Sequence, residues 1–289
     1  MTIDSQNGLR MGYIDDTIND RPSVEAAAKV PQVRISGDKF EGQVVVITGA
    51  AQGIGEVTAC LFARQGASIA LVDMDAEKAE NVASKLKQEN VTAEAFVCDI
   101  ADEAAVRGLV DSIVGRFGQI DVLVHLAGIY PFQPIADHSF SLYQKVVSVN
   151  LDGCFLLTRA ILPIMQEKGY GRIINTSSNT FESPVPGLSA YVAAKAAVRG
   201  FTRVTATEAG PGITANIIVP GLVRTDRIWN SHVTQTGERP LFDMALGKQL
   251  IKRHGLPIDV AHTICFIASP EAQFITGQVF DVSGGMTFQ

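Results

Sequence analysis

Residues 44–56 read Val-Val-Val-Ile-Thr-Gly-Ala-Ala-Gln-Gly-Ile-Gly-Glu, and this stretch decides the fold. Its β-branched start predicts a buried strand, and the residues after it have the apolar spacing of a helix. Gly49, Gly53 and Gly55 fall where the strand turns into the helix, so the backbone can turn sharply there and approach a bound phosphate closely. The free N–H groups of a helix N-terminus also suit phosphates. A glycine triplet alone is equally typical of an ordinary tight turn, but the strand before it and the helix after it favour a nucleotide site.

Apolar runs and helical segments continue to alternate along the chain. Helical periodicity is expected over residues 53–65, 76–88 and 103–117, and strands over 44–47, 68–72, 93–98, 121–125, 172–176, 213–219 and 278–282. Most of these runs are continuously apolar, as in strands covered on both faces of a parallel sheet. We therefore predict an α/β fold over residues 41–289: a single doubly wound Rossmann-type domain with a parallel seven-stranded sheet flanked by helices. Residues 1–40 lack such periodicity and are expected to form an N-terminal extension.

The composition excludes several classes of function. The chain has 289 residues, with 24 Lys and Arg against 30 Asp and Glu, a net charge of −6 that argues against a nucleic-acid or anionic membrane surface. No apolar run approaches the roughly 20 residues that span a bilayer, and the N-terminus lacks a signal pattern, so we expect a cytoplasmic protein. The four cysteines lie far apart and the five histidines show no metal-binding spacing, so we expect free thiols and no metal site.

The second expected strand ends at Asp73, 20 residues after Gly53. A carboxylate at this position can accept hydrogen bonds from the adenosine ribose of a dinucleotide and repels the extra phosphate of NADP. No Lys or Arg lies within 48–56 or 68–75 to attract that phosphate, so NAD is the predicted cofactor. Asp99, after the third strand, is a weaker candidate for the adenine. The alternative for Asp73 is a solvated carboxylate at a strand end.

Tyr191 and Lys195 lie four residues apart in an Ala-rich helical stretch and so share one helix face. A nearby cation favours the phenolate, so Lys195, together with a positively charged nicotinamide ring, is expected to lower the phenol pKa from about 10 toward 7. Tyr191 would then act as a general base or acid. Ser178, thirteen residues earlier at a strand end, can orient the substrate oxygen. The alternatives are a surface Tyr–Lys pair and a turn or cap serine; there is no GxSxG nucleophile elbow.

Together these motifs resemble the short-chain dehydrogenase/reductase family, over about residues 39–287. The cofactor turn, the Ser178–Tyr191–Lys195 set, the PG segment at 220–221 and the C-terminal strand segment at 274–285 all occur in the family's order. The resemblance implies that Asn150 is a fourth catalytic residue, held at a helix irregularity that places a water in a proton relay with the lysine. The cofactor-binding positions it implies are Gly49, Gln52, Gly53, Ile54, Gly55, Asp73, Asp99, Ile100, Ala127, Gly128, Tyr191, Lys195, Pro220, Gly221, Val223 and Thr225. It also implies a homotetramer that uses the helices over 151–165 and 190–205 and the C-terminal segment.

The chain departs from the family pattern after the fourth strand. The family usually has Asn-Asn-Ala-Gly, whereas this chain has His125-Leu126-Ala127-Gly128. We expect His125 to replace the missing amides in structural bonding; a catalytic His125 is the alternative.

The expected substrate pocket is mostly apolar, which predicts a hydrophobic, potentially aromatic, secondary alcohol or ketone. Its loop region is expected over 226–255, with an irregular lid from 226 to about 240. The candidate lining residues are Ile129, Tyr130, Pro131, Phe132, Thr180, Phe181, Leu222, Trp229, Leu241 and Phe242. The sequence thus predicts an NAD-dependent alcohol dehydrogenase or ketone reductase. The alternatives are a biosynthetic ketoreductase that uses NAD(P)H, of acyl-carrier, polyketide or steroid type, and a non-catalytic NAD-sensing protein.

Overall fold

The computed structural model describes residues 39–231, 237 and 239–289. Seven strands form an all-parallel sheet in the order β3-β2-β1-β4-β5-β6-β7. They are β1 (Val44–Thr48), β2 (Ser68–Asp73), β3 (Ala93–Val97), β4 (Val122–His125), β5 (Gly171–Thr176), β6 (Ile213–Pro220) and β7 (Val279–Val282). The predicted α/β Rossmann-type fold is confirmed, and each predicted strand end lies within one residue of the observed end. The expected extension lies outside the described residues except for its last two, Lys39 and Phe40.

Helices cover both faces of the sheet. One face packs against α2 (Gly53–Ala63), α3 (Ala76–Gln88) and α10 (Pro257–Ala268), and the other against α4 (Glu103–Phe117), α6 (Gly153–Lys168) and α7 (Ser189–Glu208). Successive strand residues enter opposite layers: Val45 and Ile47 belong to the first hydrophobic cluster, whereas Val46 belongs to the second. Both faces of the strands are therefore buried from water, which explains why their sequences are continuously apolar.

A long helical stretch, Phe140–Lys168, joins α5 (Phe140–Val147), a π-helical turn η3 (Ser148–Asp152) and α6. By length and composition alone this stretch is apolar enough to cross a membrane. Its α6 part, however, packs against α4, β5 and β4 and buries Leu157, Ile161 and Met165. The apolar residues therefore form one side of the core.

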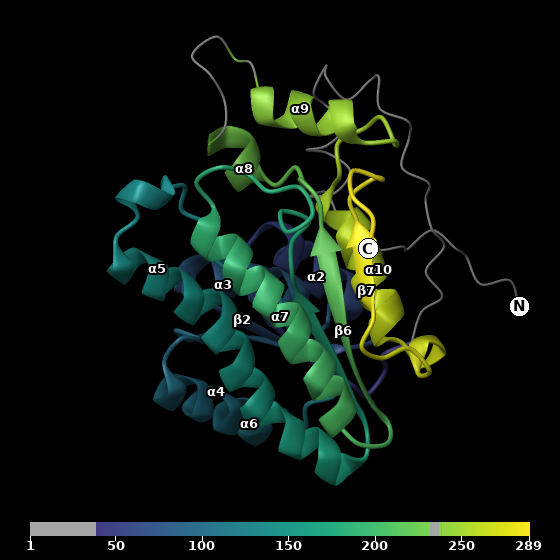
Figure 1. The fold of residues 1–289 in the computed structure, drawn as a ribbon. Coiled ribbons are helices and arrows are strands. Elements are labelled where there is room, and N and C mark those ends of the chain that lie inside the picture. Colours follow the sequence, from purple (N-terminus) through teal and green to yellow (C-terminus); the bar gives the residue numbers. More distant parts are fainter. Residues whose placement is uncertain (1–38, 232–236, 238) are drawn as a thin grey trace, which may run out of the picture.

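The segment after β6 differs from the prediction. Where an irregular stretch was expected from residue 226, the chain forms helix α8 (Asp226–Ser231), and α9 (Pro240–Lys248) follows. The prediction was wrong there because Thr225 caps the helix, accepting a hydrogen bond from the Ile228 N–H at 3.4 Å, and Trp229 is buried against Phe242. Both helices lie beyond the carboxyl end of β6 (Figure 1). Residues 232–236 and 238 of the expected lid lie outside the described residues. The short 3₁₀ turns are η2 (Ile135–Asp137) and η4 (Pro270–Ala272).

Candidate active site

A cleft of about 910 Å³ opens at the carboxyl ends of the strands. It lies beside β1 and β4, where the strand order reverses, the place where doubly wound sheets bind ligands. Every residue that the family resemblance assigns to the cofactor lines this cleft: Gly49, Gln52, Gly53, Ile54, Gly55, Asp73, Asp99, Ile100, Ala127, Gly128, Tyr191, Lys195, Pro220, Gly221, Val223 and Thr225.

The glycine turn between β1 and α2 is closely packed. Gly49 and Gly53 have φ of 69° and 61°, which favour glycine. A Cβ on Gly55 would lie 2.0 Å from the Gly49 carbonyl oxygen, so no larger residue fits there. The Gln52 side chain does not cap α2, whose first-turn N–H groups border the cleft. The turn therefore offers hydrogen-bond donors and the positive end of a helix dipole, an arrangement that fits a pyrophosphate.

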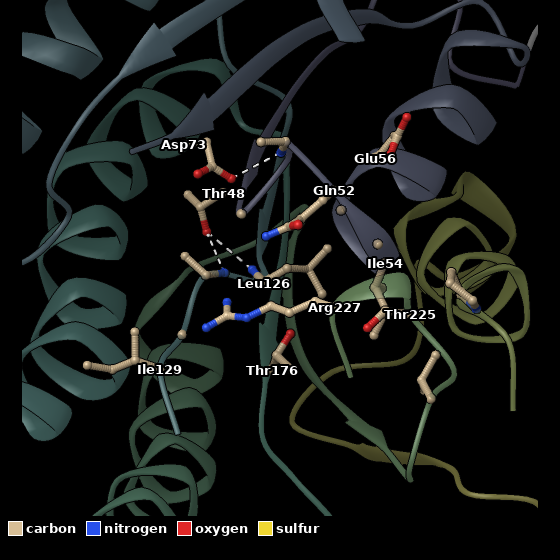
Figure 2. Close-up of a pocket in the computed structure, with 18 of the residues that line it drawn as sticks. Thr48, Gln52, Ile54, Glu56, Asp73, Leu126, Ile129, Thr176, Thr225 and Arg227 are labelled. Atoms are coloured by element: carbon tan, nitrogen blue, oxygen red, sulfur yellow. Dashed lines mark hydrogen bonds between the residues drawn. The ribbon is translucent and has the colours of Figure 1, made fainter. Parts of the chain in front are cut away.

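Asp73, the last residue of β2, lines the cleft and is held in place by backbone N–H groups. One carboxylate oxygen accepts a hydrogen bond from the Ala51 N–H at 3.0 Å (Figure 2), and the other accepts one from the Asp75 N–H at 3.1 Å. Lys78 also lines the cleft, and its ammonium pairs with the Asp75 carboxylate at 2.6 Å. Lys78 was not predicted, because it lies beyond the segment 68–75 and only the first turn of α3 brings it back to the cleft.

Tyr191 and Lys195 from α7 meet Ser178, which follows β5, at the inner end of the cleft. Lys195 is 2% exposed, and its ammonium donates a hydrogen bond to the Thr176 carbonyl at 2.9 Å. The Lys195 nitrogen lies 5.8 Å from the centre of the Tyr191 ring. The Ser178 hydroxyl accepts hydrogen bonds from the N–H and hydroxyl of Thr180, at 3.2 and 2.9 Å. The three side chains thus surround one small volume.

The expected low pKa of Tyr191 is not produced by these side chains. Burial raises the pKa of Tyr191 to about 12, and the hydrogen bond with Ser178 offsets only part of that rise. Burial also lowers the pKa of Lys195 to about 8. The side chains alone therefore do not bring the phenol pKa near 7, because desolvation outweighs the hydrogen bond with Ser178, and the expected lowering also requires the positively charged nicotinamide ring.

Asn150 lies in the π-helical turn η3, a helix irregularity of the kind that the family resemblance implied. Its amide donates hydrogen bonds to the carbonyls of Ile129, at 2.8 Å, and Val146, at 2.9 Å. Its Oδ1 is buried without a hydrogen-bond partner among the described residues. A Cβ on Gly128 would lie 2.5 Å from this oxygen and 3.5 Å from the Lys195 nitrogen. Asn150 and Lys195 therefore both border the space beside Gly128, where a relayed proton would pass.

His125 has a structural hydrogen bond, as expected for a replacement of the usual amide. The Thr48 hydroxyl accepts from the N–H groups of Leu126 and Ala127, each at 3.2 Å, so its own proton points to His125 Nδ1 at 3.0 Å. The ring is fully buried, and burial followed by the Lys195 charge lowers the pKa of His125 to about 3. The neutral imidazole therefore links β4 to β1 through its hydrogen bond with Thr48.

Arg199, one helical turn after Lys195, was not predicted. Its guanidinium donates to the Ser177 hydroxyl at 2.8 Å and to the Ser178 carbonyl at 3.0 Å, and it pairs with the Glu182 carboxylate. It also donates to the side chain of Gln289 at 2.7 Å. No local pattern reveals this contact, because the partners come from distant parts of the sequence. Arg199 thereby fixes the backbone that carries Ser178.

A smaller apolar pocket of about 150 Å³ opens beside Ser178 and Tyr191. Of the residues predicted to line the substrate site, Tyr130, Phe132, Thr180, Leu222 and Leu241 line this pocket, and Ile129 lines the main cleft. Trp229 and Phe242 instead pack against each other in the interior, with ring centres 4.9 Å apart. Phe181 lies under the Arg199 guanidinium, and Pro131 lines neither cavity of the described chain. Ile228 and Met244, from the predicted loop region, also line the pocket, and Val185, Leu188 and Met286 line it without having been predicted.

Comparison with known proteins agrees with this geometry. A family model described as enoyl-(acyl carrier protein) reductase matches residues 49–287. The chain is 37% identical to (2S)-[(R)-hydroxy(phenyl)methyl]succinyl-CoA dehydrogenase subunit BbsD of Thauera aromatica, over 85% of this chain and 97% of the relative. It is 37% identical to 2,3-dihydro-2,3-dihydroxybenzoate dehydrogenase of Bacillus subtilis, over 86% of this chain and 97% of the relative. It is 33% identical to a 3-oxoacyl-[acyl-carrier-protein] reductase of Thermotoga maritima, over 86% of this chain and 99% of the relative.

Proposed function

The chain belongs to the short-chain dehydrogenase/reductase family of oxidoreductases, and we propose that it transfers a hydride between NAD(H) and a hydrophobic secondary alcohol or ketone. One observation carries the proposal: Ser178, Tyr191 and Lys195 meet where the large cleft joins the apolar pocket. A substrate oxygen in the pocket and a cofactor in the cleft would then reach the same three side chains.

The side chains have separate roles in the proposed reaction. The Tyr191 hydroxyl takes the proton of the alcohol during oxidation and returns it during ketone reduction. The Ser178 hydroxyl donates a hydrogen bond to the substrate oxygen while the charge on that oxygen changes. Lys195 and Asn150 border the path by which the proton of Tyr191 exchanges with solvent. When bound, the nicotinamide cofactor would accept the hydride of the alcohol in oxidation and supply it in ketone reduction, and its oxidised form carries a positive charge that favours the phenolate.

We propose NAD rather than NADP because Asp73 stands at the adenosine end. Its carboxylate would bind the ribose hydroxyls, the N-terminus of α2 the pyrophosphate, and Lys195 and Thr225 the nicotinamide end. Lys78 weakens the argument from charge, but it is already paired with Asp75. Fluorescence titration with NADH and NADPH tests this preference. Asp73→Ser should reduce the difference between the affinities for NADH and NADPH. Tighter binding of NADPH by the unmodified protein would refute the role given to Asp73.

The apolar pocket supports a substrate with a hydrophobic group, aliphatic or aromatic. Aliphatic side chains and Tyr130 and Phe132 surround the space beside Tyr191. Among the relatives, one is named for a phenyl-bearing substrate and another for a dihydroxylated benzoate. The similarity to an acyl-carrier-protein reductase keeps a biosynthetic ketoreductase as the alternative. A panel of aryl and alkyl ketones and acyl thioesters, followed by NADH absorbance, distinguishes the two.

Tyr191→Phe tests the reaction itself. This variant removes only the proton-carrying hydroxyl, so turnover should fall by at least about a hundredfold. NADH should still bind with nearly unchanged affinity, which separates loss of chemistry from loss of fold. Unchanged turnover would eliminate the proposed mechanism. An unmodified protein that binds NADH but turns over no alcohol or ketone would favour an NAD-sensing role.

We also propose a cytoplasmic homotetramer, by analogy with the family and from the charge and composition of the chain.

A further inference from the structure

Helix α8 is anchored to the protein by Trp229. The indole is buried between the guanidinium groups of Arg224 and Arg239, 3.9 and 4.0 Å from the ring centre, and meets Phe242 edge-on. Arg227 precedes Trp229 by two positions, which is about 200° around a helix. Its side chain therefore leaves α8 on the side opposite the anchor, toward the cleft.

The Arg227 side chain reaches into the middle of the cleft. Its guanidinium carbon lies 5.4 Å from the centre of the Tyr130 ring, and Figure 2 shows the group between Leu126 and Thr176. The start of α8 also touches the glycine turn, since a Cβ on Gly53 would lie only 3.0 Å from Thr225 Cγ2. The segment that begins α8 therefore reaches from the glycine turn, which Thr225 contacts, to Tyr130, beside which the Arg227 guanidinium lies.

Arg227 also supplies a charge that the glycine turn lacks. Residues 49–57 contain no Lys or Arg. Of the lysines nearby in the cleft, Lys78 pairs with Asp75 at 2.6 Å and Lys85 with Glu56 at 3.5 Å. Arg227 makes no hydrogen bond or ion pair with the described residues, and its planar fork matches two phosphate oxygens. Because Asp73, Asp99 and Glu56 also line the cleft, a pyrophosphate there needs a compensating cation.

We propose that Arg227 binds the pyrophosphate of the cofactor from the side opposite the glycine turn. The contact would attach α8, which also borders the apolar pocket through Ile228, directly to the bound dinucleotide. Cofactor binding would then help to close the substrate pocket. This inference rests on the proposed use of a dinucleotide by the same cleft.

Equilibrium binding to a series of ligands tests the proposal without turnover. Isothermal titration of the full chain would use NADH, ADP-ribose and adenosine. Arg227→Gln should weaken the binding of NADH and of ADP-ribose by about tenfold to a hundredfold, which is the contribution of a charge-assisted hydrogen bond. The affinity for adenosine, which has no phosphate, should stay unchanged. Arg227→Lys should recover part of the lost affinity, because the ammonium keeps the charge but cannot donate two parallel hydrogen bonds as the guanidinium does.

Lys145→Gln is the matched control, because Lys145 carries the same charge and lines the same cleft from α5. If Arg227→Gln and Lys145→Gln weaken NADH binding equally, the effect comes from the overall charge of the cleft and the assignment to Arg227 is overturned. Equal affinity of Arg227→Gln and unmodified protein for ADP-ribose would also overturn it. Failure of the unmodified protein to bind NADH would instead reject the proposed function, so the two failures are distinguishable. Arg227 is exposed, so both of its variants should melt like the unmodified protein.

Discussion

At the scale of single residues, the proposed catalytic role of Lys195 conflicts with the stability of the fold. Its ammonium is buried with one carbonyl partner, and burial lowers its pKa from 10.5 to about 8. In the unfolded chain the lysine binds its proton more tightly than in the folded protein. The charge therefore destabilises the fold in full below pH 8, and the destabilisation disappears as the pH rises to about 10.5.

Lys195→Met should therefore stabilise the protein while abolishing turnover. We expect the free energy of unfolding to rise by about 1–3 kcal/mol at pH 7, allowing for the Thr176 carbonyl that loses its donor. Urea unfolding at pH 7 and at pH 10.5 measures this. The difference between variant and unmodified protein should shrink toward zero at the higher pH, and a gain that does not depend on pH would contradict the explanation.

Arg199 should affect turnover through the position of Ser178. Arg199→Met removes the cationic partner of the Glu182 carboxylate and the guanidinium hydrogen bond to the Ser178 carbonyl. We expect a loss of about 2–4 kcal/mol in stability and about tenfold in kcat.

The double variant Arg199→Met/Glu182→Gln separates these two effects. It removes the orphaned charge, so most of the stability should return, but kcat should stay low because Ser178 is still unsupported. If kcat recovers together with stability, Arg199 has only a structural role.

At the scale of elements, local sequence predicts the strands and helices well and their junctions poorly. The runs at β1 and β6 are buried on both faces, so hydrophobicity alone marks their ends. The π-helical turn at η3 has no such local mark, because the hydrogen bonds from Asn150 to Ile129 and Val146 combine a local and a distant partner. Arg227 and Arg199 were missed for the same reason: their contacts join α8 to the loop after β4, and α7 to the C-terminus. The proposed catalytic motif is local, whereas the residues that position it are not.

Gly128→Ala tests the junction between β4 and η3. The added methyl group would lie 2.5 Å from Asn150 Oδ1, and Asn150 cannot withdraw easily because its amide is held by two carbonyls. We expect kcat to fall by about tenfold or more and stability by about 1–3 kcal/mol. Thermal melting and steady-state kinetics measure both quantities.

Gly115→Ala provides the control for that substitution. Gly115 lies in α4 with nothing within 4 Å of an added Cβ, so alanine should stabilise the protein by about 0.5–1 kcal/mol and leave kcat unchanged. A similar response of the two variants would mean that the space beside Gly128 has no special role.

At the scale of the whole molecule, the exposed aromatic and aliphatic side chains of the described residues include two sets outside the main cleft. On α6 and α7, Phe155 is 43% and Val204 53% exposed, and Phe155 meets Phe201 edge-on. Near the C-terminus, Phe266, Phe274 and Phe288 are exposed as well. Two separate apolar surfaces on one chain are what a tetramer with twofold symmetry requires, since each surface can pair with its own copy.

We therefore expect the unmodified protein to be a tetramer and Phe155→Glu to dissociate it into dimers. The substitution would place like charges against each other across a twofold axis and remove about 1.5–3 kcal/mol of apolar burial per copy. Light scattering coupled to size exclusion measures the mass. Phe140→Glu, on the same helical stretch but stacked on Tyr143, is the control and should remain tetrameric. A monomeric unmodified protein, or dissociation by both substitutions alike, would contradict this assignment of the α6–α7 surface. Because η3 and the α7 residues Tyr191 and Lys195 lie on the same helices as this surface, dissociation should also lower kcat.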